Sequence, residues 1–199
     1  MRTETPWGHW DPLTPQAVAE LFKDAPFLWW VAGGYAIEAF AGRTVREHAD
    51  IDLGIFRDDE AELHRRLDGW DAHCADPPGI LRPWLADETL PASVHDIWVR
   101  GQAGGPWRFQ LLINEREGTE WIYRRDARTR RDIAELTWDS GGVRYLAPEV
   151  QLLFKAKDPR PKDEVDFETA APLLSERQRA WLRVQLEREF PGHDWARRL

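Results

Sequence analysis

The sequence is poor in cysteine: among 199 residues, Cys74 is the single one. One thiol excludes a disulfide framework and a cysteine-based zinc or iron-sulfur site, and it suits a reducing compartment. No apolar run approaches the roughly 18 residues that a membrane span needs, the longest being residues 27–34. The first thirty residues also lack a basic start followed by an apolar run. We therefore expect no secretory signal, no membrane segment and a cytoplasmic location.

An excess of positive charge is also missing. The chain has 27 Lys and Arg against 35 Asp and Glu, a formal net charge of -8. This balance makes broad nucleic-acid binding an unfavourable hypothesis and favours cationic partners. Material for a core is plentiful, because 42% of the residues are hydrophobic and twelve are Trp. The composition predicts one compact domain with at most a small appendage, and it leaves the oligomeric state open.

The N-terminal part begins with alternating helix and strand patterns. Residues 14–23 start with Thr and Pro, a typical N-cap and first helical position, and carry apolar residues at helical spacing. Residues 27–32 show no polar alternation, which predicts a strand buried on both faces. Gly33-Gly34 then turns the chain into a predicted helix that ends at Gly42.

The next segment, residues 50–56, alternates in polarity. This alternation places Asp50 and Asp52 on one face of a strand, about 6 to 7 Å apart. Two such carboxylates repel each other and suit a hard cation such as Mg²⁺. The preceding Gly33-Gly34 turn allows close approach of a ligand, and the helix after it directs free N–H groups toward that ligand, commonly a phosphate. The combination predicts metal-assisted phosphate chemistry.

The remaining segments predict the rest of the architecture. Residues 58–70 predict a helix with an apolar stripe of Leu63, Leu67 and Trp70. Residues 93–100 and 107–114 predict a hairpin, and residues 120–124 a further strand. Helical patterns follow over residues 148–157 and 161–174, and Ser175 begins a capping box for a final helix.

These patterns together predict an α/β (α+β) chain with a mixed twisted sheet. The acids would lie on one face of the sheet and helices on the other. Residues 1–146 would form the core, and residues 147–199 a C-terminal helical portion that forms one wall of the cleft.

The order Gly33-Gly34, then Arg46-x-His48-x-Asp50-x-Asp52, resembles the nucleotidyltransferase superfamily that includes DNA polymerase beta. Residues 30–38 are similar to the branch of aminoglycoside and lincosamide adenylyltransferases, and residues 146–166 resemble the helical appendage of those enzymes. The resemblance spans roughly residues 27–175.

This resemblance implies a sheet of the minimal nucleotidyltransferase type and transfer of AMP from ATP to a hydroxyl. It also implies two Mg²⁺ ions and release of pyrophosphate, which is how two metals assist an in-line displacement at phosphorus. The resemblance gives a metal-binding role to Asp50 and Asp52, and a nucleotide-binding role to Gly33, Gly34, Arg46, His48 and Lys155. Because Lys155 and Lys157 are two residues apart on a predicted helix, we expect at most one of them to face the nucleotide.

The family also has a third carboxylate on a neighbouring strand, and two strands compete for it. Gln110 and Asn114 lie on the second hairpin strand, but an amide is neither a general base nor a good Mg²⁺ ligand. Asp96 lies on the first hairpin strand among apolar residues, where an unpaired carboxylate would be costly. We choose Asp96 as the third metal ligand or base. The alternative is that Asp96 pairs with an arginine such as Arg100.

Two further features stay open at this stage. The arginine cluster over residues 124–131 is interrupted by Asp126, so it is an ion-paired surface, a set of nucleotide-phosphate contacts or an RNA contact. Glu149 stands at the start of a predicted helix, where it is either a first-turn acid or a base at the acceptor site.

The resemblance favours a small-molecule acceptor, such as an aminoglycoside-like antibiotic, and hence a role in antibiotic resistance. The acidic balance of the chain suits a cationic acceptor of this kind. Two alternatives remain. The same site modifies a protein or a tRNA, as in toxin-antitoxin systems, or the chain is a regulatory module that binds nucleotide without catalysis.

Overall fold

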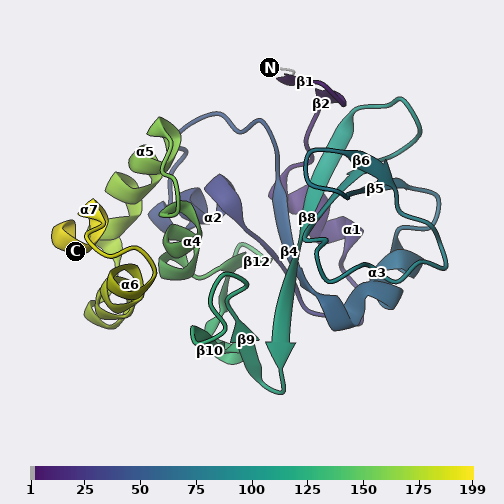
Figure 1. The fold of residues 1–199 in the computed structure, drawn as a ribbon. Helices are drawn as coiled ribbons and strands as arrows, with labels where there is room; N and C mark the ends of the chain where they lie inside the picture. Colours follow the sequence, from purple (N-terminus) through teal and green to yellow (C-terminus); the bar gives the residue numbers. More distant parts are fainter. Residues whose placement is uncertain (1–2) are drawn as a thin grey trace.

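The computed structural model describes residues 3–199, and one mixed β-sheet forms its centre (Figure 1). The main strands are β3 (Trp29–Val31), β4 (Asp52–Phe56), β5 (Asp71–Ala75), β6 (Leu81–Pro83), β7 (Asp96–Arg100), β8 (Trp107–Glu117), β11 (Thr137–Ser140) and β12 (Val143–Leu146). Their order is β11-β12-β3-β4-β8-β7-β5-β6. Strand β4 is antiparallel to β3 and parallel to β8, while β8 is antiparallel to β7. The predicted mixed sheet is confirmed.

Two small hairpins extend this sheet. Strands β1 (Thr3–Thr5) and β2 (Gly8–Trp10) pair with each other, and β2 also pairs with β8. Strands β9 (Glu120–Ile122) and β10 (Arg130–Asp132) pair with each other, and β9 continues from the far end of β8.

The helices are α1 (Pro15–Leu21), α2 (Gly33–Ala41), α3 (Glu60–Arg66), α4 (Pro148–Lys155), α5 (Pro161–Ala170), α6 (Glu176–Glu189) and α7 (Asp194–Arg198). Local signals fix their ends: the Thr14 hydroxyl caps α1 by accepting from the N–H of Ala17. Gly42 ends α2 in the left-handed region, at φ 65°. Within residues 3–199, no helix combines the length and apolar character needed to cross a membrane.

The two faces of the sheet pack against different helices. Val31, Leu53 and Ile55 point to a core shared with α1 and α3. Trp30 and Phe56 belong to a second core, on the opposite face, shared with α4 to α7. In Figure 1 these C-terminal helices lie together to one side of β4 and β8. The acid-bearing face of β4 is therefore covered only in part, which leaves room for a site.

Several predicted boundaries are wrong. Helix α3 ends at Arg66, so Trp70 packs on the core from outside the helix. Strand β4 begins at Asp52, so Asp50 precedes the strand. The predicted helix over residues 161–174 is α5 followed by a 3₁₀ turn over Ala171–Leu173, because Pro172 removes a helical donor.

The sequence did not predict the two outermost strands at either end of the sheet. Strands β5 and β6 lie in and next to the turn-rich stretch after Trp70, and β11 and β12 precede the C-terminal helices. These are short strands whose residues lack a clear period-2 pattern. Pairing with neighbours that are distant in sequence, such as β12 with β3, stabilises them instead.

Gly54 in the middle of β4 makes room for the indole of Trp30. A Cβ at Gly54 would lie 2.0 Å from Trp30 Cε2, and Trp30 is only 1% exposed, so the ring has little freedom to move. We expect Gly54→Ala to lower the free energy of unfolding by about 1–3 kcal/mol through overpacking. Urea unfolding measures this loss. Gly101→Ala, at an open position, is the matched control, and equal stability of both variants would contradict the packing argument.

Candidate active site

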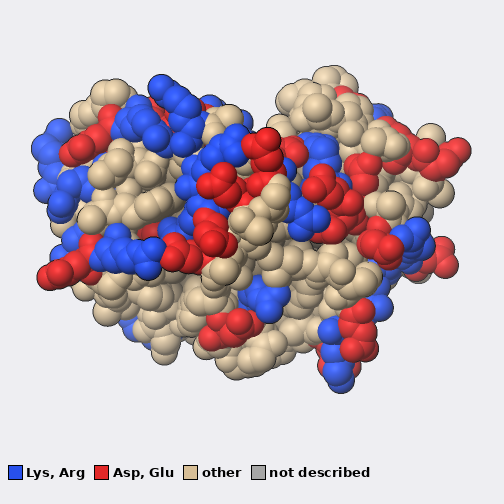
Figure 2. Space-filling model, turned by 90° about the horizontal axis from the view of Figure 1, so that it is seen from below, with Lys and Arg blue, Asp and Glu red and all other residues tan. Residues whose placement is uncertain are grey.

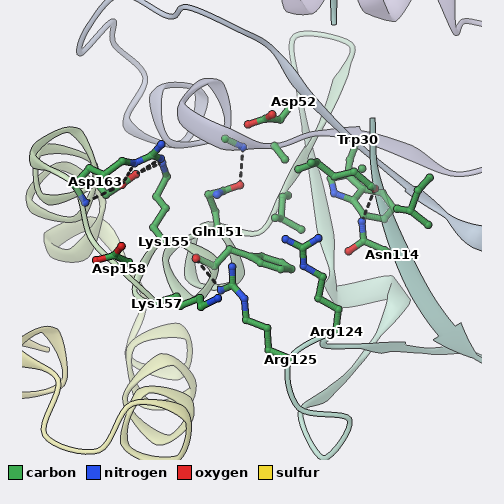
Figure 3. Close-up of a pocket in the computed structure, with 18 residues that line it drawn as sticks. Trp30, Asp52, Asn114, Arg124, Arg125, Gln151, Lys155, Lys157, Asp158 and Asp163 are labelled. Carbon is green, nitrogen blue, oxygen red and sulfur yellow. Dashed lines mark hydrogen bonds and ion pairs between the residues drawn. The ribbon is translucent and has the colours of Figure 1, made fainter. Parts of the chain in front are cut away.

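A cavity of about 390 Å³ lies on the acid-bearing side of the sheet, between β4, β8 and the end of α4 (Figure 3). One part of its wall is formed by the glycine turn and Asp52, and another by apolar side chains that include Trp30 and Phe154. The cationic residues of the wall are Arg124, Arg125, Lys155, Lys157 and Arg160. The acids of the wall are Asp52, Asp158 and Asp163. Carboxylates together with a larger number of cations suit a polyanionic ligand that is bound together with a metal ion.

The structure brings the glycine turn and Asp52 into direct contact. Gly33 has a φ of 70°, and a Cβ there would lie 2.5 Å from Asp52 Oδ2. Both observations require glycine at this position. The N–H of Gly33 donates to Gln151 Oε1 at 2.6 Å, so α4 holds the turn from the other side. The N-terminus of α2 thus begins beside the carboxylate.

Asp52 carries an unfavourable negative charge in the absence of a cation. Desolvation in the recess, followed by the charge of Asp50 and more weakly that of Asp96, raises the pKa of Asp52 to about 7, although Lys155 partly offsets this. Hard carboxylate oxygens that repel one another are suitable Mg²⁺ ligands. The residues present therefore fit the metal that the resemblance implies.

The geometry does not provide a complete metal centre made of protein ligands alone. Among residues 3–199, no group of three or more His, Cys, Asp and Glu side chains is arranged to hold a metal ion. Mg²⁺ in nucleotide-dependent enzymes commonly takes one or two carboxylates and completes its shell with phosphates and water. The metal-binding role of Asp50, Asp52 and Asp96 stays a prediction.

The register of the sheet places Asp96 on the same face as Asp52 and the two amides. Asp52 pairs with Gln110, and Asp96 pairs with Leu112, so both acids lie on the same face. Gln110 donates from Nε2 to Asp96 Oδ1 at 3.0 Å. Asn114 is used within the fold, because it donates to the carbonyl of Leu112 and accepts from an indole N–H.

The alternative partner for Asp96 is engaged elsewhere: Arg100 Nε lies 2.6 Å from Asp71 Oδ2. We therefore expect Asp96→Asn to lower kcat of the AMP transfer that the resemblance implies by about 10²-fold, the lower range for loss of a general base. The pyrophosphate release rate measures it. Asp71→Asn, the matched change at the Arg100 pair, should leave kcat nearly unchanged. Unaltered kinetics in Asp96→Asn would redirect attention to residues 110–114.

Arg46 and His48 lie over Gly34, where a Cβ would come within 2.3 Å of either side chain, and they do not line the cavity. Arg46 Nη2 pairs with Asp166 Oδ2 at 3.1 Å. The His48 ring packs on Tyr35 with centroids 4.1 Å apart. Burial, followed by the charge of Arg46, lowers the pKa of His48. In this structure both residues brace the loop before β4, and their contact with phosphate stays a prediction.

Lys155 lines the cavity but is held by two carboxylates. Its Nζ lies 2.8 Å from Asp163 Oδ1 and 2.7 Å from Asp166 Oδ2, and its side chain is 7% exposed. Lys157 also lines the cavity, and the expectation that at most one of the two lysines faces the nucleotide stays a prediction. Helix α4 ends at Lys155, so helical spacing does not separate the two side chains, and both line the cavity.

Glu149 does not line the cavity that contains Asp52; it lines a separate one beside Arg131 and Gln178. Its carboxylate is fully buried and accepts from Arg131 Nη2 at 2.7 Å and Gln178 Nε2 at 2.9 Å. This pairing also accounts for one member of the arginine cluster, and Arg128 and Arg130 likewise pair with nearby acids. Three arginines of the cluster, Arg128, Arg130 and Arg131, thus form ion pairs. The other two, Arg124 and Arg125, line the cavity.

The sequence analysis gave no site role to the residues that hold the site from the C-terminal side, although Asp163 and Asp166 belong to the stretch that resembles the helical appendage. Gln151, Asp163 and Asp166 are buried and contact Gly33, Lys155 and Arg46. The one available signal was the acidic pair on α5 itself, which also reads as a helix-stabilising arrangement with Lys162. A glutamine on α4 carried no signal.

Residues 16–73, which include the glycine turn and Asp52, match the model of the aminoglycoside-2''-adenylyltransferase family. The solved structure of the lincosamide antibiotic adenylyltransferase LnuA with lincomycin has a TM-score of 0.57 and 14% identity, and the match covers 82% of this chain and all (100%) of that one. The fold is that of a nucleotidyltransferase. The family match over residues 16–73 confirms the resemblance to the antibiotic adenylyltransferase branch that was inferred from the sequence.

Structures of a second such nucleotidyltransferase agree. The crystal structure of ANT(2'')-Ia in complex with adenylyl-2''-tobramycin has a TM-score of 0.53 and 15% identity, over 87% of this chain and 95% of that one. The solution structure of ANT(2'')-Ia has a TM-score of 0.54 and 16% identity, over 87% and 89%. The comparison with curated proteins found no match. The family match and these structural matches thus all involve antibiotic adenylyltransferases.

Proposed function

We propose that this chain is an Mg²⁺-dependent adenylyltransferase that transfers AMP from ATP to a hydroxyl of a small-molecule antibiotic and releases pyrophosphate. The observation that carries the proposal is the contact of Asp52 with the Gly33 turn at the wall of a cationic cavity. A carboxylate and a helix N-terminus at one place suit a metal-bound triphosphate. The family match over residues 16–73 includes both features.

We assign a role in this reaction to each group of residues at the cavity. Asp50 and Asp52 would hold the two Mg²⁺ ions, which neutralise phosphate charge when bound. Asp96 would accept the proton of the acceptor hydroxyl. The hydroxyl oxygen would attack the α-phosphorus as the bond from that phosphorus to pyrophosphate breaks. The cationic wall would hold the phosphates in line, and positioning of this kind supplies most of the acceleration in phosphoryl transfer.

The two parts of the chain would have different roles in the reaction. Residues 1–146 supply the acids and the glycine turn, and we propose that they form the catalytic core. Residues 147–199 supply Gln151 and Lys155 to the same cavity, and we propose that this helical portion closes the cleft. Both parts of the chain therefore supply residues to one binding site.

A cationic, aminoglycoside-like or lincosamide-like acceptor is the class that we favour. The chain has a net charge of -8, and the two named relatives were solved with lincomycin and with an adenylyl-tobramycin. On the face drawn in Figure 2, Lys and Arg side chains are interspersed with Asp and Glu instead of forming one basic stripe. A basic stripe is typical of an extended RNA contact, and this face does not have one.

The test is an assay of pyrophosphate release with Mg²⁺, ATP and a panel that contains tobramycin and lincomycin. Transfer is expected to depend on Mg²⁺, to stop on chelation, and to increase the mass of the acceptor by one AMP group. GTP, CTP and UTP in parallel determine the base preference. Tight binding of Mg-ATP without turnover on small molecules, proteins and RNA would instead support the regulatory alternative.

A further inference from the structure

The cations around the cavity differ in whether the protein already neutralises them. Lys155 and Arg160 pair with Asp163, and Arg125 donates to two oxygen atoms of the fold. Arg124 and Lys157 have no ion-pair or hydrogen-bond partner within residues 3–199. The phosphate-binding lysine that the resemblance implies is therefore compensated by protein carboxylates, whereas Arg124 keeps its charge available to a ligand.

A braced turn presents Arg124 at the cavity. The N–H of Tyr123 donates to the carbonyl of Thr129 at 2.9 Å, and the N–H of Thr129 donates to the carbonyl of Asp126 at 2.9 Å. The Thr129 hydroxyl donates to Gln185 Oε1 at 3.1 Å, which fixes the turn to α6. Tyr123 and Thr129 are both buried. A side chain on such a turn has a defined position, so a ligand does not have to order the backbone.

The next residue, Arg125, takes the structural role in the same turn. Its Nη1 donates to the hydroxyl of Tyr123 at 2.9 Å and to the carbonyl of Phe154 at 3.0 Å, which joins the turn to the end of α4. In Figure 3 the guanidinium of Arg124 extends among the lining side chains on the side of the cavity that Asp52 faces, and no interaction is marked on it. Its charge also reaches His95, whose pKa is lowered first by burial and next by Arg124.

We propose that Arg124 binds a phosphate group of the nucleotide; this inference rests on the proposed function. An unpaired guanidinium has planar donors that match phosphate oxygens in a bidentate arrangement, and it stays charged at every working pH. The arginine cluster thereby acquires a specific member for substrate binding. Its other members maintain the turn and its surroundings.

The test compares Arg124→Gln with Arg128→Gln. Arg128 lies on the same turn, its side chain is 76% exposed, and it pairs with Asp126 outside the cavity, so the control removes one charge without touching the site. We expect the Kd of Mg-ATP, measured by calorimetry, to rise about 10- to 100-fold in Arg124→Gln, the range for loss of a charge-assisted hydrogen bond. Arg128→Gln should bind within about twofold of wild type.

A second ligand separates phosphate binding from stacking on the base. Mg-tripolyphosphate should lose affinity in Arg124→Gln by the same factor as Mg-ATP. A loss for Mg-ATP alone would show contact with the base and overturn the proposal, as would unchanged Mg-ATP affinity in a variant with wild-type thermal stability. A wild-type protein that does not bind Mg-ATP would reject the proposed function itself.

Discussion

Replacement of Asp52 by Asn is expected to abolish AMP transfer while the protein stays folded. Asn has the same shape, so the contact with the Gly33 turn is kept, but it lacks the charge that we propose binds the metal. Metal ions supply several kcal/mol of transition-state stabilisation, and we expect kcat/KM to fall by about 10⁴-fold or more. Pyrophosphate release under saturating Mg²⁺ measures the loss.

The thermal stability of Asp52→Asn distinguishes loss of metal binding from loss of the fold. In the metal-free protein, the charge of Asp52 faces those of Asp50 and Asp96, which help to raise its pKa. Removing this charge relieves repulsion, so the metal-free variant should be at least as stable as wild type. Mg²⁺ with ATP should raise the Tm of wild type but not that of the variant. Wild-type activity in Asp52→Asn would refute the metal assignment.

The parts of the site that were predictable come from one short stretch of chain. Gly33 and Asp52 are less than twenty residues apart, and the strand-turn-helix pattern and the alternation of β4 are both local. Local patterns are sufficient to place a turn at the end of a strand and a carboxylate on a chosen face. For Asp96, the sequence pattern predicted the face of the sheet on which it lies. Its position relative to Asp52 follows only from the pairing of β7 with β8.

The residues that complete the site depend on contacts between distant parts of the chain. Gln151 reaches Gly33 across 118 residues, and Asp166 reaches Arg46 across 120. No local periodicity encodes such pairs, since each residue alone is compatible with a solvated helix face. Arg124 was singled out as part of a cluster, but its separation from the ion-paired arginines depends on how the turn packs against α4 and α6.

Replacement of Asp166 by Asn is expected to cause the largest loss of stability. Asp166 is fully buried, and its carboxylate lies 3.1 Å from Arg46 Nη2 and 2.7 Å from Lys155 Nζ. It connects the loop before β4 with α4 and α5. Without its charge, Arg46 has no other carboxylate partner in the part of the chain that the structure describes. Breaking a buried ion pair from one side costs about 3–5 kcal/mol, which urea unfolding measures.

A matched exposed pair identifies burial as the cause of this loss. Asp194 pairs with Arg197 at 2.8 Å, but both side chains are more than half exposed, and such pairs contribute about 0–1 kcal/mol. Asp194→Asn should therefore change the free energy of unfolding by less than about 1 kcal/mol. An equally small change in Asp166→Asn would mean that Asp163 compensates Lys155 and that water compensates Arg46. In that case the network would not be what holds the C-terminal helices to the glycine turn.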